Sequence, residues 1–63
     1  MKVSLHRCDV APASDRWQAT EDGFDLGVPI GSAATPLKAI ADLLWAMNIE
    51  DIEPSDCLIH WEN

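Results

Sequence analysis

The feature that most constrains the fold of this chain is one amphipathic helix pattern that begins after Thr35. Thr35 is a favoured N-cap residue, and Pro36 suits the first helical position, where its missing N–H group is not needed. At about 100° per residue, the apolar side chains that follow form one stripe, with Lys38 and Asp42 opposite. Asn48 is a suitable C-terminal stop. The predicted stripe consists of Leu37, Ile40, Ala41, Leu43, Leu44 and Met47.

Short alternating patterns predict four β-strands around this helix. The first has Val3 and Leu5 on one face, and Asp22-Gly23 supplies a tight turn between the second and the third. Pro29 and Gly31 end the third strand. The predicted strands cover residues 2–10, 16–20, 24–28 and 57–62. The order β-β-β-α-β predicts an α+β fold, in which one helix packs on one face of an antiparallel-rich sheet.

Length and charge limit what such a fold can do. A chain of 63 residues forms a single domain, residues 1–63, and buries only about 60% of its unfolded surface. Eleven acidic residues against four basic ones give a net charge of −7. Such a surface repels nucleic acid and anionic lipid, and it attracts basic protein surfaces.

The cysteines and the N-terminus predict a cytoplasmic protein. Cys8 and Cys57 lack the CxxC spacing, and "MKVSLHRCDV" has no apolar leader segment. No apolar run approaches the roughly 20 residues that cross a bilayer. We therefore expect reduced thiols, with a Cys8–Cys57 disulfide as the less favoured alternative.

Residues that could carry chemistry do not form a recognisable site. His6 and Cys8 share a strand face but have no third, orienting residue. A zinc site would also need Cys57 and His60, which point to opposite faces of a strand. The loop before the helix lacks the GxxxxGK[ST] phosphate pattern, so it is expected to act as an ordinary cap. The sequence predicts no enzyme activity, no cofactor and no metal.

Two acidic clusters and one tryptophan suggest protein binding instead. One cluster lies at the predicted hairpin and the other follows the helix, and together they could imitate the phosphates of a duplex. Trp45 lies beside Lys38 and Asp42, away from the apolar stripe. It is either an exposed interface anchor or packed against residues 49–54 or an adjacent strand. The predicted partner-binding residues are Glu21, Asp22, Asp25, Asp42, Trp45, Glu50, Asp51, Glu53 and Asp56.

Part of the chain resembles the N-terminal domain of HicB-type antitoxins. The resemblance rests on Trp17-x-Ala19, on Asp22-Gly23 and on the run "GSAATPLKAIADLL". The family's Gly-x-Thr-x-x-(acid)-Ala-(aliphatic) helix start would be matched by Gly31, Thr35, Ala39 and Ile40, with Lys38 at its acidic position and with four residues instead of two from Gly31 to Thr35. The resemblance implies a β-β-β-α-β fold and a protein-binding role, but no DNA-binding domain.

The charge leads to one functional hypothesis, and the resemblance leads to an alternative. The first is a small acidic phage-encoded inhibitor, similar in size, charge and expected fold to DNA-mimicking anti-CRISPR proteins. Its partner would be a protein with a basic surface, such as a CRISPR effector subunit, with no direct nucleic acid and no membrane. The alternative is a HicB-like antitoxin module that neutralises an RNA-cleaving toxin. An uncovered edge strand leaves both a monomer and a homodimer open.

Overall fold

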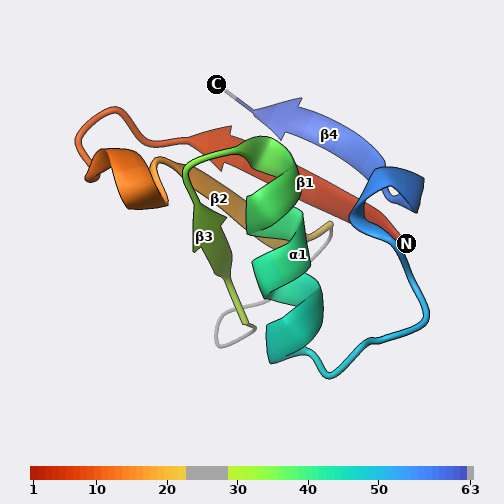
Figure 1. Ribbon diagram of the computed structural model, residues 1–63. Helices are drawn as coiled ribbons and strands as arrows, with labels where there is room; N and C mark the ends of the chain where they lie inside the picture. The colour runs from red at the N-terminus through yellow and green to blue at the C-terminus, as the bar shows by residue number, and fades with distance from the viewer. Residues whose placement is uncertain (23–28, 63) are drawn as a thin grey trace.

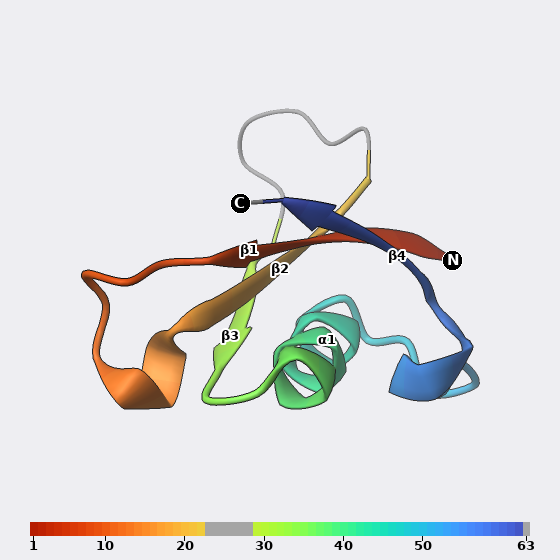
Figure 2. The ribbon, with the colours of Figure 1, turned by 90° about the horizontal axis from the view of Figure 1, so that it is seen from above.

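The computed structural model describes residues 1–22 and 29–62, and it has one helix packed on one face of a four-stranded sheet (Figures 1 and 2). This arrangement confirms the predicted α+β class. The connection between the first two strands and the connection that follows the helix each contain a short 3-10 turn. The elements are β1 (Lys2–Arg7), η1 (Ala13–Asp15), β2 (Trp17–Glu21), β3 (Gly31–Ala33), α1 (Pro36–Ala46), η2 (Pro54–Asp56) and β4 (Leu58–Glu62).

The strands lie in the order β3-β2-β1-β4, so β3 and β4 form the two edges. β1 is antiparallel to β2, and β2 is antiparallel to β3, whereas β1 and β4 are parallel. The chain therefore passes from one edge of the sheet to the other through α1. Figure 2 shows α1 on one side of the sheet, which leaves the described part of the opposite face without a covering helix.

The third described strand is not where the sequence predicted it. Gly31 was expected to end a strand, but it begins β3, where it pairs with Ala19, and Ala33 pairs with Trp17. The predicted strand 24–28 lies outside the described residues. A run of Gly, Ser and Ala carries almost no β-propensity, so the sequence alone gave no signal here. Pairing with β2 and packing against α1 hold these residues extended.

The core lies between the sheet and α1. Leu5, Ile40, Leu43 and Val3 are the largest fully buried side chains, and each contributes roughly 1.5–3 kcal/mol of transfer free energy before entropy is subtracted. The predicted inward face of the first strand, with Val3 and Leu5, is therefore confirmed. The complete buried apolar set is Val3, Leu5, Ala19, Ala39, Ile40, Leu43, Leu44 and Cys57.

The buried face of α1 differs in part from the predicted stripe. Leu37 is 51% exposed and Ala41 is exposed, whereas Ala39 is completely buried. The helix is thus rotated toward β3 relative to the expectation. The cause is Gly31: a Cβ built there would lie 2.8 Å from the Leu43 Cα and even closer to the Ala39 carbonyl oxygen. The backbones of β3 and α1 meet directly because Gly31 has no side chain.

Both ends of α1 are capped as the sequence predicts. The Thr35 hydroxyl accepts a hydrogen bond from the Lys38 N–H at 3.3 Å. At the other end Asn48 adopts a left-handed φ of 59°, and its N–H donates to the Trp45 carbonyl. The Ile49 N–H donates to the Leu44 carbonyl at 2.9 Å. These two bonds form a Schellman motif, so the helix ends with its last carbonyls partly satisfied.

Candidate protein-binding surface

Six of the predicted acidic residues gather at the end of the sheet at which β1 begins. We call this surface the acidic pole; Lys2 is the one basic side chain that the described strands place there. Glu21 and Asp22 reach it from the end of β2, and the rest reach it from the connection between α1 and β4. The acidic pole consists of Glu21, Asp22, Glu50, Asp51, Glu53 and Asp56, of which all but Asp22 are exposed.

The strand register explains why the two acidic clusters lie at the same end of the sheet. Glu21 pairs with Val3 on β1, and the Asp22 N–H donates to the Lys2 carbonyl at 3.0 Å. On the other side of β1, the Leu58 N–H donates to the Met1 carbonyl at 2.9 Å. The end of β2 and the start of β4 therefore flank the same end of β1. Two interstrand spacings separate them, about 10 Å, which is also about the Debye length at 0.1 M salt.

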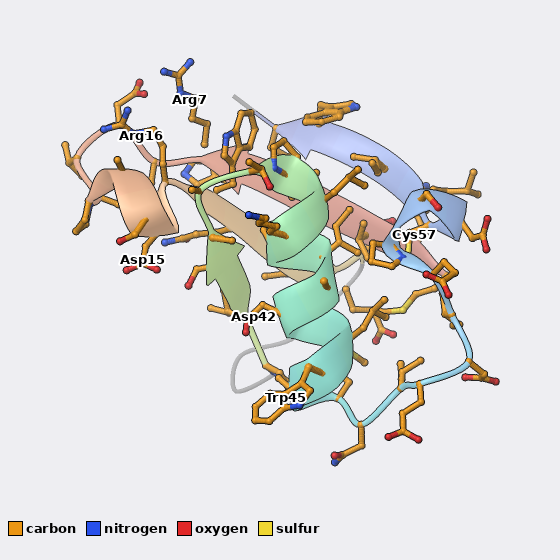
Figure 3. All side chains as sticks on the ribbon, in the orientation of Figure 1. Arg7, Asp15, Arg16, Asp42, Trp45 and Cys57 are labelled. Atoms are coloured by element: carbon orange, nitrogen blue, oxygen red, sulfur yellow. The ribbon has the colours of Figure 1, made fainter. Side chains whose placement is uncertain are left out.

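The other end of the sheet carries the remaining basic residues. Arg7 ends β1, Arg16 precedes β2, and Lys38 lies in the first turn of α1, which follows β3. Figure 3 shows Arg7 and Arg16 at the end of the molecule opposite Cys57. Three acids accompany these three bases, so this end is close to neutral; they are Asp9, Asp15 and Glu62. Five of the seven net negative charges therefore belong to the acidic pole, with Asp42 and Asp25 supplying the other two.

Asp22 is the one carboxylate of the acidic pole that has fixed partners. Its Oδ1 accepts a hydrogen bond from the Ser4 hydroxyl at 3.0 Å, and its Oδ2 lies 3.5 Å from the Lys2 ammonium. The Ser4 hydrogen bond lowers the pKa of Asp22, burial opposes this effect, and the Lys2 charge adds to the lowering. Asp22 thus stays ionised and holds the end of β2 against β1.

Asp42 lies away from the acidic pole and serves the sheet edge. Its Oδ2 accepts a hydrogen bond from the backbone N–H of Ser32 at 3.0 Å. That N–H belongs to β3 and points away from β2, so the Asp42 carboxylate caps a donor on an edge with which no described strand pairs (Figure 3). Its predicted partner-binding role stays a prediction. Asp25, also predicted to bind a partner, lies outside the described residues.

Trp45 is 80% exposed, which decides between its two predicted environments. It points outward near the end of α1 (Figure 3) rather than packing against residues 49–54. The acidic connection begins a few residues further along the chain, at Glu50. An exposed tryptophan beside carboxylates can supply apolar contact or a cation–π interaction to a basic partner.

The sulfur and imidazole groups do not converge. Cys8 and Cys57 are both free, and Cys57 is buried with its Sγ 3.7 Å from the Glu53 carbonyl oxygen. Cys57 stands opposite Met1 at one end of β1, whereas Cys8 follows the other end. At 3.3 Å per residue, the length of β1 separates Cys8 from Cys57 by about 20 Å, so these two cysteines cannot form a disulfide within the chain. Within residues 1–22 and 29–62, no three or more His, Cys, Asp or Glu side chains form a group that could hold a metal ion.

Sequence reasoning missed the exposed apolar side chains at the β4 edge. Trp61 is 55% exposed. It packs edge-to-face on half-buried Trp17, with ring centroids 5.8 Å apart. Leu58, on the opposite face of β4, is 70% exposed. Alternation along residues 57–62 identified the strand, but it could not show that the strand lies at an edge.

Comparison of the chain with models of protein families, with characterised proteins and with solved structures gave no match. Among the helices that the structure describes, none has the length and apolar character needed to cross a membrane.

Proposed function

We propose that this chain is a non-enzymatic inhibitor that binds a basic, nucleic-acid-binding surface of another protein and blocks its access to DNA. One observation carries the proposal: most of the net charge is concentrated at one end of a small rigid domain instead of being spread over it. An evenly spread charge would explain solubility, but it would not direct a partner to one face.

The size of the acidic pole suits this role. The domain measures 31 × 21 × 19 Å, so the pole occupies one end about 20 Å across. A duplex carries one phosphate charge per roughly 1.7 Å, so the six carboxylates match about 10 Å of its axis. Because the two acidic clusters lie at the same end of the domain, a partner that approaches this end meets negative charge from both. That charge would accelerate encounter with Lys and Arg side chains and set their register.

Trp45 adds an apolar contact to this electrostatic surface. Charge pairs at the rim of an interface mainly affect the association rate, whereas a buried tryptophan commonly slows dissociation. We therefore assign encounter to the carboxylates of the acidic pole and retention to Trp45. The partner would be a protein of the bacterial cytoplasm, and a phage-encoded inhibitor of a CRISPR effector subunit fits this description.

A HicB-like antitoxin module is the alternative, and the acidic pole suits it as well, since an RNA-cleaving toxin also needs a basic surface. The residues that carry the resemblance all have structural roles. Gly31 permits close helix packing, Thr35 caps α1, and Ala39 and Ile40 are buried. The motif therefore supports a fold and does not distinguish between the two partners.

A charge reversal with a matched control tests the proposal. The triple variant Glu50→Lys, Asp51→Lys, Glu53→Lys changes the acidic pole. The control Asp9→Lys, Asp15→Lys, Glu62→Lys makes the same change in net charge at the opposite end. All six substituted side chains are exposed, so both variant proteins should fold. Each protein is immobilised, and bound host proteins are eluted with increasing salt and with duplex DNA.

The wild-type chain and the control should retain a nucleic-acid-binding protein that salt and duplex DNA both release. The variant with the reversed acidic pole should lose it. Equal loss with both variants would show that only total charge matters, and it would refute the proposal. Rescue of growth when a toxin is co-expressed, without competition by DNA, would favour the antitoxin alternative.

A further inference from the structure

The two edges of the sheet differ in how their backbone groups are protected. β3 has three residues, and the Asp42 carboxylate caps the outward N–H of Ser32. β4 has five residues and contains no proline, lysine or glycine, the residues that commonly protect an edge. No described strand pairs with its outer side, and Figures 1 and 2 show no described element beyond it.

The register with β1 identifies the free backbone groups of β4. The Leu58 N–H donates to the Met1 carbonyl, so the backbone groups of Leu58, His60 and Glu62 face β1. The N–H and C=O groups of Ile59 and Trp61 therefore point away from the sheet. These four groups are the hydrogen-bonding capacity that the edge presents.

We propose that the outer edge of β4 pairs with β4 of a second copy of this chain, antiparallel and about a two-fold axis at His60. In this register Ile59 lies opposite Trp61 of the second copy, and Trp61 lies opposite Ile59 of the second copy. Each pair exchanges two hydrogen bonds, so all four outward groups of both strands are satisfied. The result is one eight-stranded sheet with both helices on the same face.

Two other registers satisfy the edge less well. A two-fold axis at Ile59 would place Trp61 opposite Cys57 of the second copy, but the Cys57 N–H already donates to the Pro54 carbonyl at 3.3 Å. If the second β4 were shifted by a single residue, the outward N–H and C=O groups of one strand would lie opposite residues whose backbone groups face β1. The register at His60 also places apolar Ile59 beside apolar Trp61 of the second copy, a favourable cross-strand pair.

Charge favours the antiparallel orientation of a second copy over the parallel one. The acidic pole lies at the start of β4, and the nearly neutral end with Arg7 and Glu62 lies at its finish. Antiparallel pairing places the acidic pole of one copy next to the nearly neutral end of the other. The two poles point in opposite directions, so repulsion between them is small. Dimerisation does not depend on a basic partner protein, since the acidic poles take no part in it.

A charge-swap experiment at position 60 tests both the partner and the register, because only the proposed register places residue 60 opposite itself. Wild type, His60→Lys, His60→Asp and an equimolar mixture of the two variants are compared by sedimentation equilibrium over a wide concentration range. His6→Lys is the matched control, since His6 is also exposed but lies on β1, away from the edge.

Wild type and His6→Lys should approach twice the 6.9 kDa mass of one chain as concentration rises. Each His60 variant alone should dissociate up to about fivefold more readily, because like charges face each other directly, and the mixture should restore the dimer. In the dimer the amides of Ile59 and Trp61 should exchange slowly with solvent. A wild-type monomer at every concentration would overturn the proposal and leave a strand from another protein as the occupant. A dimer indifferent to position 60 would overturn it as well.

Discussion

Replacing Gly31 with alanine should destabilise the domain more than any other single-methyl change at this helix–sheet contact. The added Cβ would meet the Ala39 carbonyl oxygen, the Leu43 nitrogen and the Leu43 Cα. All three are backbone atoms, so no side-chain rotation can make room, and α1 must move away from β3. That movement separates the helix from the core residues that it covers.

The magnitude follows from the size of the domain. Overpacking a core commonly costs 1–3 kcal/mol, and a clash with backbone belongs at or above about 3 kcal/mol. At roughly 0.05–0.15 kcal/mol per residue, the whole domain has a free energy of unfolding of only about 3–9 kcal/mol. We therefore expect Gly31→Ala to lower the Tm by about 12–24 °C, or to leave the chain unfolded.

Urea unfolding followed by circular dichroism measures the effect. Ser14→Ala is the matched control, because Ser14 is exposed in η1, and it should change the free energy of unfolding by less than about 0.5 kcal/mol. Adding Ala39→Gly should not rescue Gly31→Ala, since the side chain of Ala39 is not the obstacle. If Gly31→Ala unfolds at the same urea concentration as Ser14→Ala, the direct backbone contact between β3 and α1 is wrong.

Two further predictions concern single hydrogen bonds. Thr35→Ala removes the acceptor for the Lys38 N–H and should lower the free energy of unfolding by about 1 kcal/mol. Thr35→Ser keeps a hydroxyl at this position and should retain most of that stability. Urea unfolding measures both variants. Ser4→Ala should raise the pKa of Asp22 toward the usual value for aspartate, measured by an NMR titration of the Asp22 carboxyl. Because the pKa of Asp22 is lowered in the folded state, the Asp22 carboxylate stabilises the fold above about pH 4. This contribution is lost as the pH falls through the lowered pKa of the folded state. Ser4→Ala should therefore make the free energy of unfolding depend less on pH in this acidic range. An unchanged Asp22 titration would contradict the role of Ser4.

The sequence predicted the elements whose signal is local. Thr35 and Pro36 located the start of α1, and Asn48 located its end, because caps act within one turn of the chain. Alternation at Val3 and Leu5 gave the inward face of β1. The connection around Gly31 was misread because its strand pairing depends on β2 and α1, which are distant in sequence.

The candidate surface shows the same limit. The two groups of acids were visible as separate clusters, but their meeting depends on β1 lying between β2 and β4. No pattern within Leu58–Glu62 could show that one side of that strand stays unpaired. Exposure of Trp45 was left open for the same reason, since it depends on where residues 49–54 run.

The edge-to-face contact of Trp17 and Trp61 gives the domain an intrinsic spectroscopic signal of its folded state. The two indoles come from β2 and β4 and meet across β1, so their coupled absorption in the near ultraviolet should vanish when these three strands separate. Trp45 is the third tryptophan of the chain, which has no tyrosine, and it faces solvent on the helix. Its emission should respond to the arrival of another protein at the helix end while the paired indoles stay unchanged. One unlabelled sample can therefore report unfolding and recognition as two separate signals.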